Sequence, residues 1–161
     1  MSIQVGDRLP EGHFSQMRGD GPVTVDISTY FANRKIILFS VPGAFTPTCS
    51  NNHLPGFIQN YARFKEFGID AVACTAVNDV FVMHAWELSA QAGSIDMLAD
   101  GNGSFIRSIG LEMDSTAFDM GYRGRRFALV ADNAVVTHLF IDAVGAFHVS
   151  SAEHVLTELS G

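Results

Sequence analysis

The stretch VPGAFTPTCS, residues 41–50, places a cysteine behind two threonines and two prolines at the end of an apolar run. Cysteine reacts as a thiolate, and the first turn of a helix stabilises negative charge through its free N–H groups and dipole. Thr46 suits the N-cap and Pro47 the first helical position, so we expect Cys49 in that first turn. A buried structural cysteine behind an ordinary helix cap fits the same spacing.

A histidine and two arginines are the other groups with chemistry to offer Cys49. His53 follows Cys49 by four residues on one helix face, which allows a Cys/His nucleophile pair, although we favour a surface histidine. Arg123 and Arg126 lie in GYRGRRF, just before an apolar strand pattern. A buried arginine needs an anionic partner, so Arg126 pairs either with a carboxylate or with the thiolate of Cys49.

No metal or organic cofactor is expected from the remaining motifs. Cys49, His53, Cys74 and His84 lack the compact spacing of a zinc site. The turn at 100–104, DGNGS, lacks the later ligands of a calcium loop, and its Gly-x-Gly is no dinucleotide fingerprint. The second and last cysteine, Cys74 in AVACTAV, is expected to be a buried, inert thiol, and there is no C-x-x-C motif.

Composition narrows the possible partners and compartment. The 161 residues are 47% hydrophobic, enough for one domain with a real core, and the net charge is −7 without a Lys/Arg stripe. We therefore expect neither nucleic acid nor a membrane as a partner, and the apolar runs are too short to span a bilayer. The start, MSIQVGDRLPEG, resembles neither a secretory signal nor a transit peptide. The two cysteines do not make a disulfide framework, so a reducing, cytoplasmic location is expected.

The hydrophobic periodicity predicts alternating strands and helices that would position these residues. Pro55-Gly56 should kink the first of the helices, and Gly68 and Gly93 should stop the first and second. The predicted strands are Val23–Ile27, Lys35–Val41, Ile69–Val77, Ile95–Ala99, Arg126–Ala131 and Val135–Ile141, the last two joined by a hairpin turn at 132–134. The predicted helices are Pro47–Phe67, Asp79–Ala92, Ser104–Ile109 and a last one that Ser150 or Ser151 caps and that runs to Leu159.

This order predicts a layered α/β domain with a mixed sheet. Ligands in such folds bind at the carboxyl ends of strands, and Cys49 lies just after the first central strand.

The stretch PGAFTPTCS followed by NNHLPGF resembles the active-site motif of peroxiredoxins, Pro-x3-Thr-x2-Cys, met here by Pro42, Thr46 and Cys49. The closest resemblance is to the type II, or peroxiredoxin V, subfamily, and the stretches at 71–86 and 124–136 also resemble it. The resemblance covers essentially the whole chain. It implies a single thioredoxin-like peroxiredoxin domain over residues 1–161, with a central mixed sheet flanked by helices and an N-terminal extension.

The resemblance also implies an activity and roles for the site residues. The activity is reduction of hydrogen peroxide and organic hydroperoxides without a cofactor, with Cys49 as the peroxidatic cysteine that becomes a sulfenic acid. Thr46 would bond the sulfur and the peroxide, Arg126 would stabilise the thiolate, and Pro42 would shield the site. The N–H groups of Cys49 and Ala44 would donate to the peroxide.

The sequence departs from some relatives of that subfamily in one respect. The C-terminal stretch AVGAFHVSSAEHV has no resolving cysteine, and a mid-strand Cys74 could not meet Cys49 without backbone movement. We therefore expect a one-cysteine mechanism with an external reductant, either glutathione with glutaredoxin or thioredoxin. The resemblance further implies a homodimer, for which an apolar surface including Phe45 or Phe81 could serve.

Two other functions remain open at this point. A peroxide sensor or redox relay would use the same Cys49 without high turnover, and no motif separates it from a peroxidase. A hydrolase or transferase with a Cys49/His53 pair would not need Pro42, Thr46 or Arg126, so their presence counts against it.

Overall fold

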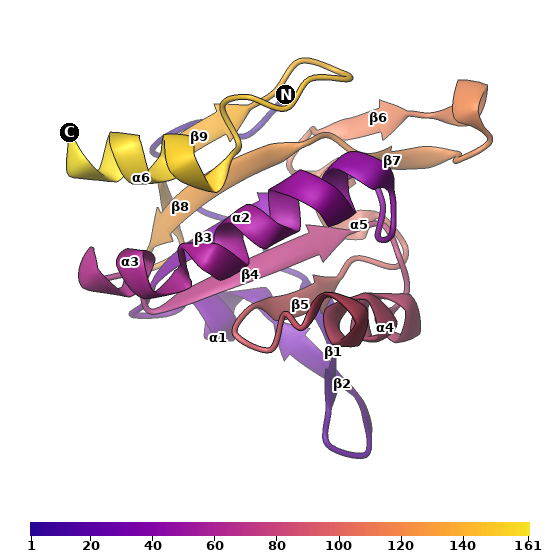
Figure 1. The fold of residues 1–161 in the computed structure, drawn as a ribbon, viewed down its shortest axis with the longest axis horizontal. Coiled ribbons are helices and arrows are strands. Elements are labelled where there is room, and N and C mark those ends of the chain that lie inside the picture. Colours follow the sequence, from indigo (N-terminus) through magenta and orange to yellow (C-terminus); the bar gives the residue numbers. More distant parts are fainter.

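A seven-stranded mixed sheet runs through the middle of the molecule in the computed structural model, which describes residues 1–161 (Figure 1). The strand order is β2-β1-β5-β4-β3-β8-β9; β3, β4 and β5 run parallel, and the other neighbouring pairs are antiparallel. The strands are β1 (His13–Arg18), β2 (Gly21–Asp26), β3 (Lys35–Ser40), β4 (Ala71–Ala76), β5 (Asp96–Ala99), β8 (Phe127–Asp132) and β9 (Val135–Ile141).

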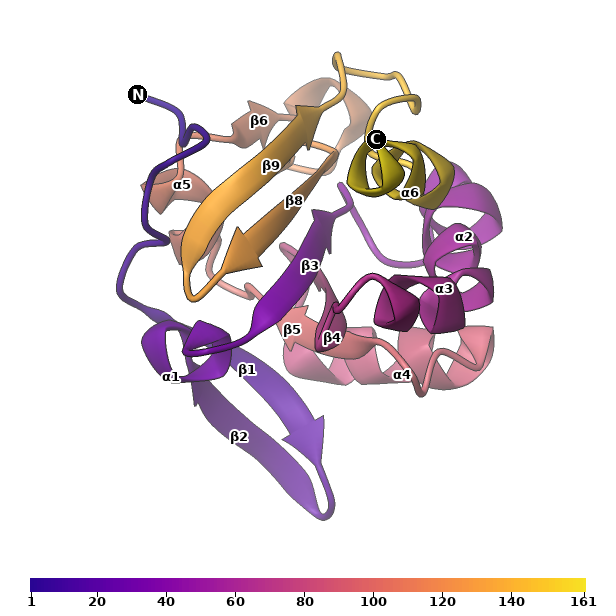
Figure 2. The ribbon, with the colours of Figure 1, turned by 90° about the vertical axis from the view of Figure 1, so that its left-hand side faces the viewer.

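Helices cover both faces of this sheet, as Figure 2 shows. One face carries α2 (Leu54–Gln59), α3 (Tyr61–Glu66), α4 (Val80–Ala90) and α6 (Ala152–Ser160). The other carries the short helices α1 (Ile27–Phe31) and α5 (Ser104–Ser108), together with a small two-stranded sheet of β6 (Glu112–Asp114) and β7 (Tyr122–Gly124). The predicted fold class, a thioredoxin-like α/β fold with a mixed sheet flanked by helices, is confirmed.

The central strands are buried on both sides, which explains why they read as continuous apolar runs. Along β3, Ile37 and Phe39 enter the core under α2, α4 and α6, while Ile36 and Leu38 enter the core on the opposite face. Cys49 belongs to the first of these two cores. The site is therefore held by packing at the carboxyl end of β3, where ligands were expected.

The structure contains several elements that the sequence analysis did not predict. Strand β1, helix α1 and the β6–β7 sheet were not predicted, because each is short and pairs with distant or weakly patterned segments. Strand β1 alternates only partly, yet it pairs with β2 along its full length and with β5 at Ser15 and Ala99. The expected N-terminal extension thus includes the edge of the main sheet.

Helix ends follow the local capping rules, with one correction. Asp79 caps α4 through Val82 N–H. Ser151, one of the two predicted caps, caps α6 through His154 N–H. Gly93 was expected to stop the second helix, but the left-handed position after α4 is taken by Gln91, with φ of 54°. Most helices use glycine or asparagine there, because other side chains are strained at positive φ.

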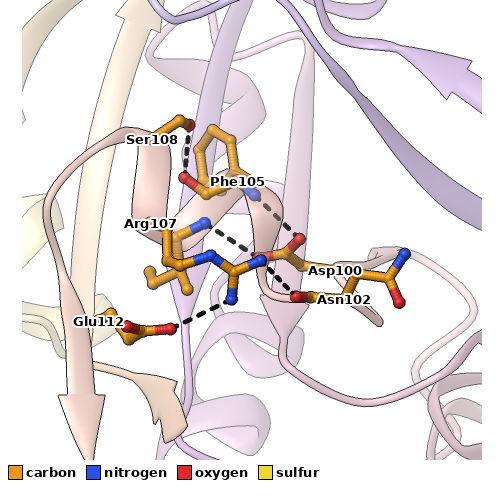
Figure 3. Close-up of polar contacts among 7 residues, drawn as sticks. Asp100, Asn102, Phe105, Arg107, Ser108 and Glu112 are labelled. Carbon is orange, nitrogen blue, oxygen red and sulfur yellow. Dashed lines mark hydrogen bonds and ion pairs between the residues drawn. The ribbon is translucent and has the colours of Figure 1, made fainter.

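Helix α5 is fixed from the preceding turn, as Figure 3 shows. The buried Asp100 accepts the N–H groups of Phe105 and Ile106, both at 3.0 Å. Arg107 closes the turn by donating to the Asn102 carbonyl at 2.8 Å and to Glu112 at 3.2 Å. The predicted turn at residues 100–103 is therefore the capping segment of α5.

None of the helices has the length and apolar character needed to cross a membrane. No group of three or more His, Cys, Asp or Glu side chains is arranged to hold a metal ion.

Candidate active site

The segment after β3 does not form the single helix that was expected over residues 47–67. One short turn at Pro47 leads into a π-helix, Cys49–His53, in which Leu54 N–H donates to the Cys49 carbonyl. Helix α2 follows with Pro55 in its first turn, and the helix is interrupted at Asn60 before α3 begins. A kink was expected at Pro55-Gly56, but the structure has a widened π-helical turn just before the proline instead. Pro55 has no N–H and crowds the preceding turn, which accounts for the widening.

Cys49 lies at the start of this π-helix and is fully buried. Ser50 N–H donates to the Thr46 carbonyl at 2.9 Å, whereas the N–H groups of Thr48 and Cys49 have no backbone acceptor. These two groups are the free donors that the sequence predicted for the first turn. They point to a site that can receive negative charge.

The Thr46 hydroxyl is oriented by the loop rather than by the sulfur. Its Oγ1 donates to the Gly43 carbonyl at 2.7 Å, so its single proton is not available to Cys49 Sγ. The expected Thr46–sulfur hydrogen bond is absent from this structure. The hydroxyl oxygen keeps free lone pairs and can accept a hydrogen bond from a bound O–H group.

The Ala44 N–H was expected to face the substrate and does not. It donates to Asn78 Oδ1 at 2.9 Å, which ties the loop before Cys49 to the loop between β4 and α4. The same loop is packed tightly at Gly43, where an added Cβ would lie 3.2 Å from Arg123 Nη1. Arg123 also donates to the Val77 carbonyl at 3.3 Å. Asn78 and Arg123 are thus supports of the loop that carries Pro42.

Arg126 makes the one side-chain hydrogen bond to the sulfur. Its Nη2 donates to Cys49 Sγ at 3.3 Å and its Nη1 donates to His53 Nδ1 at 2.8 Å. Its guanidinium also lies over the Phe147 ring, 5.7 Å from the centroid. Arg126 is in none of the ion pairs with a carboxylate. Of its two expected partners, the structure therefore selects Cys49.

His53 is buried, so the prediction of a surface histidine is wrong. Its Nε2 lies 2.9 Å from the Ser150 carbonyl, which can only accept, so Nε2 carries the proton and Nδ1 accepts from Arg126. Burial, with the nearby Arg126 charge, lowers the pKa of His53 to about 3. The neutral ring orients Arg126 and cannot act as the base for Cys49. A Cys49/His53 nucleophile pair is therefore not formed.

The loop that holds His53 is itself fixed by one carboxylate. Asp142 accepts N–H groups from His148, Val149 and Ser150, and the Ser150 hydroxyl as well. Burial alone would raise the pKa of Asp142, but these hydrogen bonds lower it below its usual value. No sequence pattern predicted this support, because Asp142 and Ser150 are about a hundred residues away from His53 in the chain.

Cys74 lies in the same core as Cys49 but differs in its chemistry. It is fully buried in the middle of β4, paired with Phe39 of β3. Burial, together with the nearby Cys49, raises the pKa of the Cys74 thiol well above its usual value. Cys74 therefore stays protonated, in agreement with the prediction of an inert thiol.

One more contact reaches the π-helix from α4. The buried Trp86 donates its indole N–H to Ser50 Oγ at 3.1 Å. The residue next to Cys49 is thereby tied to a second helix. The site thus draws on β3, β8 and α4 as well as on the π-helix.

The site contains a buried sulfur with a guanidinium beside it and free N–H groups nearby. It contains no cluster of three or more potential metal ligands. Such a site can hold a thiolate and stabilise negative charge that develops on an attacked oxygen. Of the predicted site residues, Arg126 contacts Cys49 directly, whereas Thr46 and Ala44 bond to the surrounding loops. His53 and Asn78 complete the site and were not predicted to belong to it.

Comparison with known proteins agrees with this chemistry. The Redoxin family model matches residues 4–156. Peroxiredoxin-2E-2, chloroplastic, from Oryza sativa subsp. japonica is 47% identical, over 98% of this chain and 73% of that protein.

Two solved structures are similar over nearly their whole length. Reduced Prx3 from Vibrio vulnificus in complex with H2O2 is 46% identical with a TM-score of 0.95, covering 98% of this chain and 99% of that one. The Plasmodium falciparum antioxidant protein, a 1-Cys peroxiredoxin, is 30% identical with a TM-score of 0.93 over 98% and 99% of the two chains. The chain therefore belongs to the type II branch of the peroxiredoxins and is a thiol peroxidase.

Proposed function

We propose that the peroxidase reaction runs through Cys49 in a one-cysteine cycle. The Cys49 thiolate attacks the terminal oxygen of the hydroperoxide, the O–O bond breaks, and the sulfur keeps that oxygen as a sulfenic acid. The departing oxygen takes up a proton and leaves as water or an alcohol. The observation that carries this proposal is the 3.3 Å hydrogen bond from Arg126 to the fully buried Cys49 sulfur.

Arg126 has two roles in this step. Before reaction its guanidinium balances the thiolate charge, because no carboxylate competes for it. During reaction the same cation is next to the oxygens on which negative charge develops. His53 and Phe147 hold the guanidinium in place from two other sides.

The remaining motif residues form the binding site of the peroxide. The free N–H groups of Thr48 and Cys49 donate to the oxygens, and Thr46 Oγ1 accepts the peroxide O–H while it donates to Gly43. Pro42, half-buried beside the site, excludes water from the sulfur. Ala44 is left out of this scheme, because its N–H is bonded to Asn78.

The sulfenic acid is reduced by a thiol from outside the chain. Cys74 is protonated and lies mid-strand, so it does not resolve Cys49. A peroxide is the substrate, and we propose that a thioredoxin-type protein, or glutathione with glutaredoxin, is the reductant. The similarity to a 1-Cys peroxiredoxin structure supports this cycle.

Residues 1–161 act as one peroxiredoxin domain in this proposal, in the cytoplasm and as a homodimer. Phe45 and Phe81 support the dimer, because both side chains are more than half exposed on segments joined by the Ala44–Asn78 hydrogen bond. A peroxide sensor that uses the same Cys49 is the second candidate. The sensor would be favoured if hydrogen peroxide oxidises Cys49 rapidly but every small thiol reduces the Cys49 sulfenic acid slowly.

The deciding experiment mixes fully reduced protein with one equivalent of hydrogen peroxide and traps the sulfenic acid with a selective nucleophile. Intact-mass measurement should show one adduct that maps to Cys49. Cys49→Ser should give no adduct and no turnover, whereas Cys74→Ala should keep both, the alanine leaving no hydroxyl unpaired in the core. Equal loss of turnover in the two variants would contradict the one-cysteine cycle.

A further inference from the structure

A cavity of about 140 Å³ lies beside the Cys49 site. Its walls include Pro42 and Arg126, which it shares with that site, and also Arg125 and Met113. The loop from Asp142 to Ala146 forms another part of the wall. A cavity of about 150 Å³ can hold benzene, so this one has room for a carboxylate and a few attached carbons.

The cavity is cationic in a protein whose net charge is −7. Arg125 and Arg126 both line it, and neither is in an ion pair with a carboxylate. Arg125 Nη2 donates only to a neutral group, the Asp142 carbonyl, at 2.7 Å. Arg125 Nε is buried and has no hydrogen-bond partner. Because buried donors are nearly always paired, Arg125 is the guanidinium of the cavity whose hydrogen bonds are incomplete.

The single carboxylate of the cavity wall does not fill that role. Both oxygens of Asp142 are used by the backbone N–H groups of 148–150 and by the Ser150 hydroxyl. These four donors satisfy both oxygens within the loop. Arg126 is bonded to Cys49 and His53, so Arg125 is the guanidinium left to an anion that comes from solution.

We propose that this cavity binds the carboxylate of the molecule that reacts at Cys49, with Arg125 as the residue that selects it. The proposal rests on Cys49 being the reacting sulfur. A carboxylate can be carried by an organic hydroperoxide or by the reducing thiol. In the second case the thiol sulfur bonds to the sulfenic sulfur of Cys49, and the hydroxyl leaves with the thiol proton as water.

Matched acid and ester pairs test this proposal in two arms. In the first, oxidation of Cys49 is timed with cumene hydroperoxide bearing a para-carboxylate and with its methyl ester. In the second, formation of the mixed disulfide from sulfenic Cys49 is timed with 3-mercaptopropionate and with its methyl ester. The wild-type protein should prefer the acid about three- to tenfold in at least one arm, and less at high salt.

Three variants show whether Arg125 causes the preference. Arg125→Gln should bring the acid-to-ester ratio close to one, and Arg125→Lys should restore part of it. Arg63→Gln, on the exposed side of α3, should keep the wild-type ratio. Because each ratio is taken within one protein, a general loss of activity cancels.

The arm that shows the preference identifies whether the carboxylate belongs to the hydroperoxide or to the thiol. Equal rates for acid and ester in both arms, in a protein that consumes hydrogen peroxide, would overturn the cavity proposal and leave the peroxidase cycle standing. A preference that survives in Arg125→Gln would overturn it as well. A protein that consumes no hydroperoxide overturns both the Cys49 assignment and the cavity proposal.

Discussion

Arg126 connects three residues that lie far apart in the sequence. It donates to Cys49 and to His53 with separate nitrogens, which only a planar guanidinium can do in this geometry. Lysine keeps the charge but offers a single point of contact. The difference between the two side chains therefore separates the effect of charge from the effect of orientation.

Arg126→Lys should lower the rate constant for oxidation of Cys49 by hydrogen peroxide about 10- to 100-fold, and Arg126→Gln should lower it further, by roughly 10²- to 10³-fold. Rapid-quench trapping of the sulfenic acid measures both. Arg107→Gln, which removes an exposed ion pair with Glu112, is the control and should leave the rate unchanged. Equal rates in Arg126→Gln and wild type would contradict the role given to Arg126.

His53 should make the stability of the protein depend on pH. Its pKa is about 3 in the folded protein and about 6.5 in the unfolded chain, so below pH 6.5 the unfolded chain binds a proton that the folded protein does not. The contribution of His53 is complete above pH 6.5 and falls as the pH drops toward 3. By pH 4.5 the loss amounts to about 2–3 kcal/mol.

His53→Gln removes this titration. The difference in unfolding free energy between wild type and His53→Gln should therefore shrink by about 2–3 kcal/mol from pH 7 to pH 4.5. Urea unfolding followed by circular dichroism measures it, and carboxylates common to both proteins cancel. The exposed Asn52→Gln is the control, because it changes no titratable group and its difference should stay constant. A constant difference for His53→Gln would contradict a neutral buried ring.

At this scale the sequence predicted the reactive centre better than its surroundings. A local sequence motif was enough to identify Cys49, Thr46 and Pro42, because the three lie within eight positions. The contact of Arg126 with Cys49 was one of two predicted possibilities, because a buried cation needs an anion. The burial of His53 depends on Ser150 and Phe147, which no local pattern connects to it.

Among the elements, the end of α4 contains a residue with a strained backbone conformation. Gln91 is exposed and adopts a positive φ of 54°, which costs about 1 kcal/mol for a residue with a Cβ. Gln91→Gly should raise the unfolding free energy by about 0.5–1 kcal/mol. Gln59→Gly, at a right-handed helical position in α2, should lower it by about the same amount. Urea midpoints that move in the same direction would contradict this interpretation.

The elements that were predicted are those with a strong local signal. Strands β3, β4, β8 and β9 are apolar runs, and the turn between the last two has positive φ at Asn133 and Ala134, as a tight hairpin requires. The π-helix could not be predicted, because its backbone depends on Pro55 and on packing of Cys49 in the core. Strand β1 could not be predicted either, since its pairing with β5 joins residues 84 positions apart in the chain.

For the whole molecule, the surface near Cys49 contains the exposed rings of Phe45 and Phe81. If this surface joins two copies, the wild-type protein should sediment as a dimer, and Phe81→Glu should sediment as a monomer, because the charge cannot be buried without a partner. Val5→Glu, also at an exposed apolar residue, should remain a dimer. A monomeric wild-type protein at micromolar concentration would contradict the dimer.

Trp86 is the single tryptophan of the chain, and its indole is bonded to the residue next to Cys49. Indole emission depends on hydrogen bonding and on the charge of nearby groups. Each catalytic cycle changes the charge and the size of the Cys49 side chain, so it should change the wavelength or the intensity of the Trp86 emission. Trp86 should therefore act as an intrinsic optical reporter, with which oxidation and reduction of Cys49 can be followed in real time and without a label.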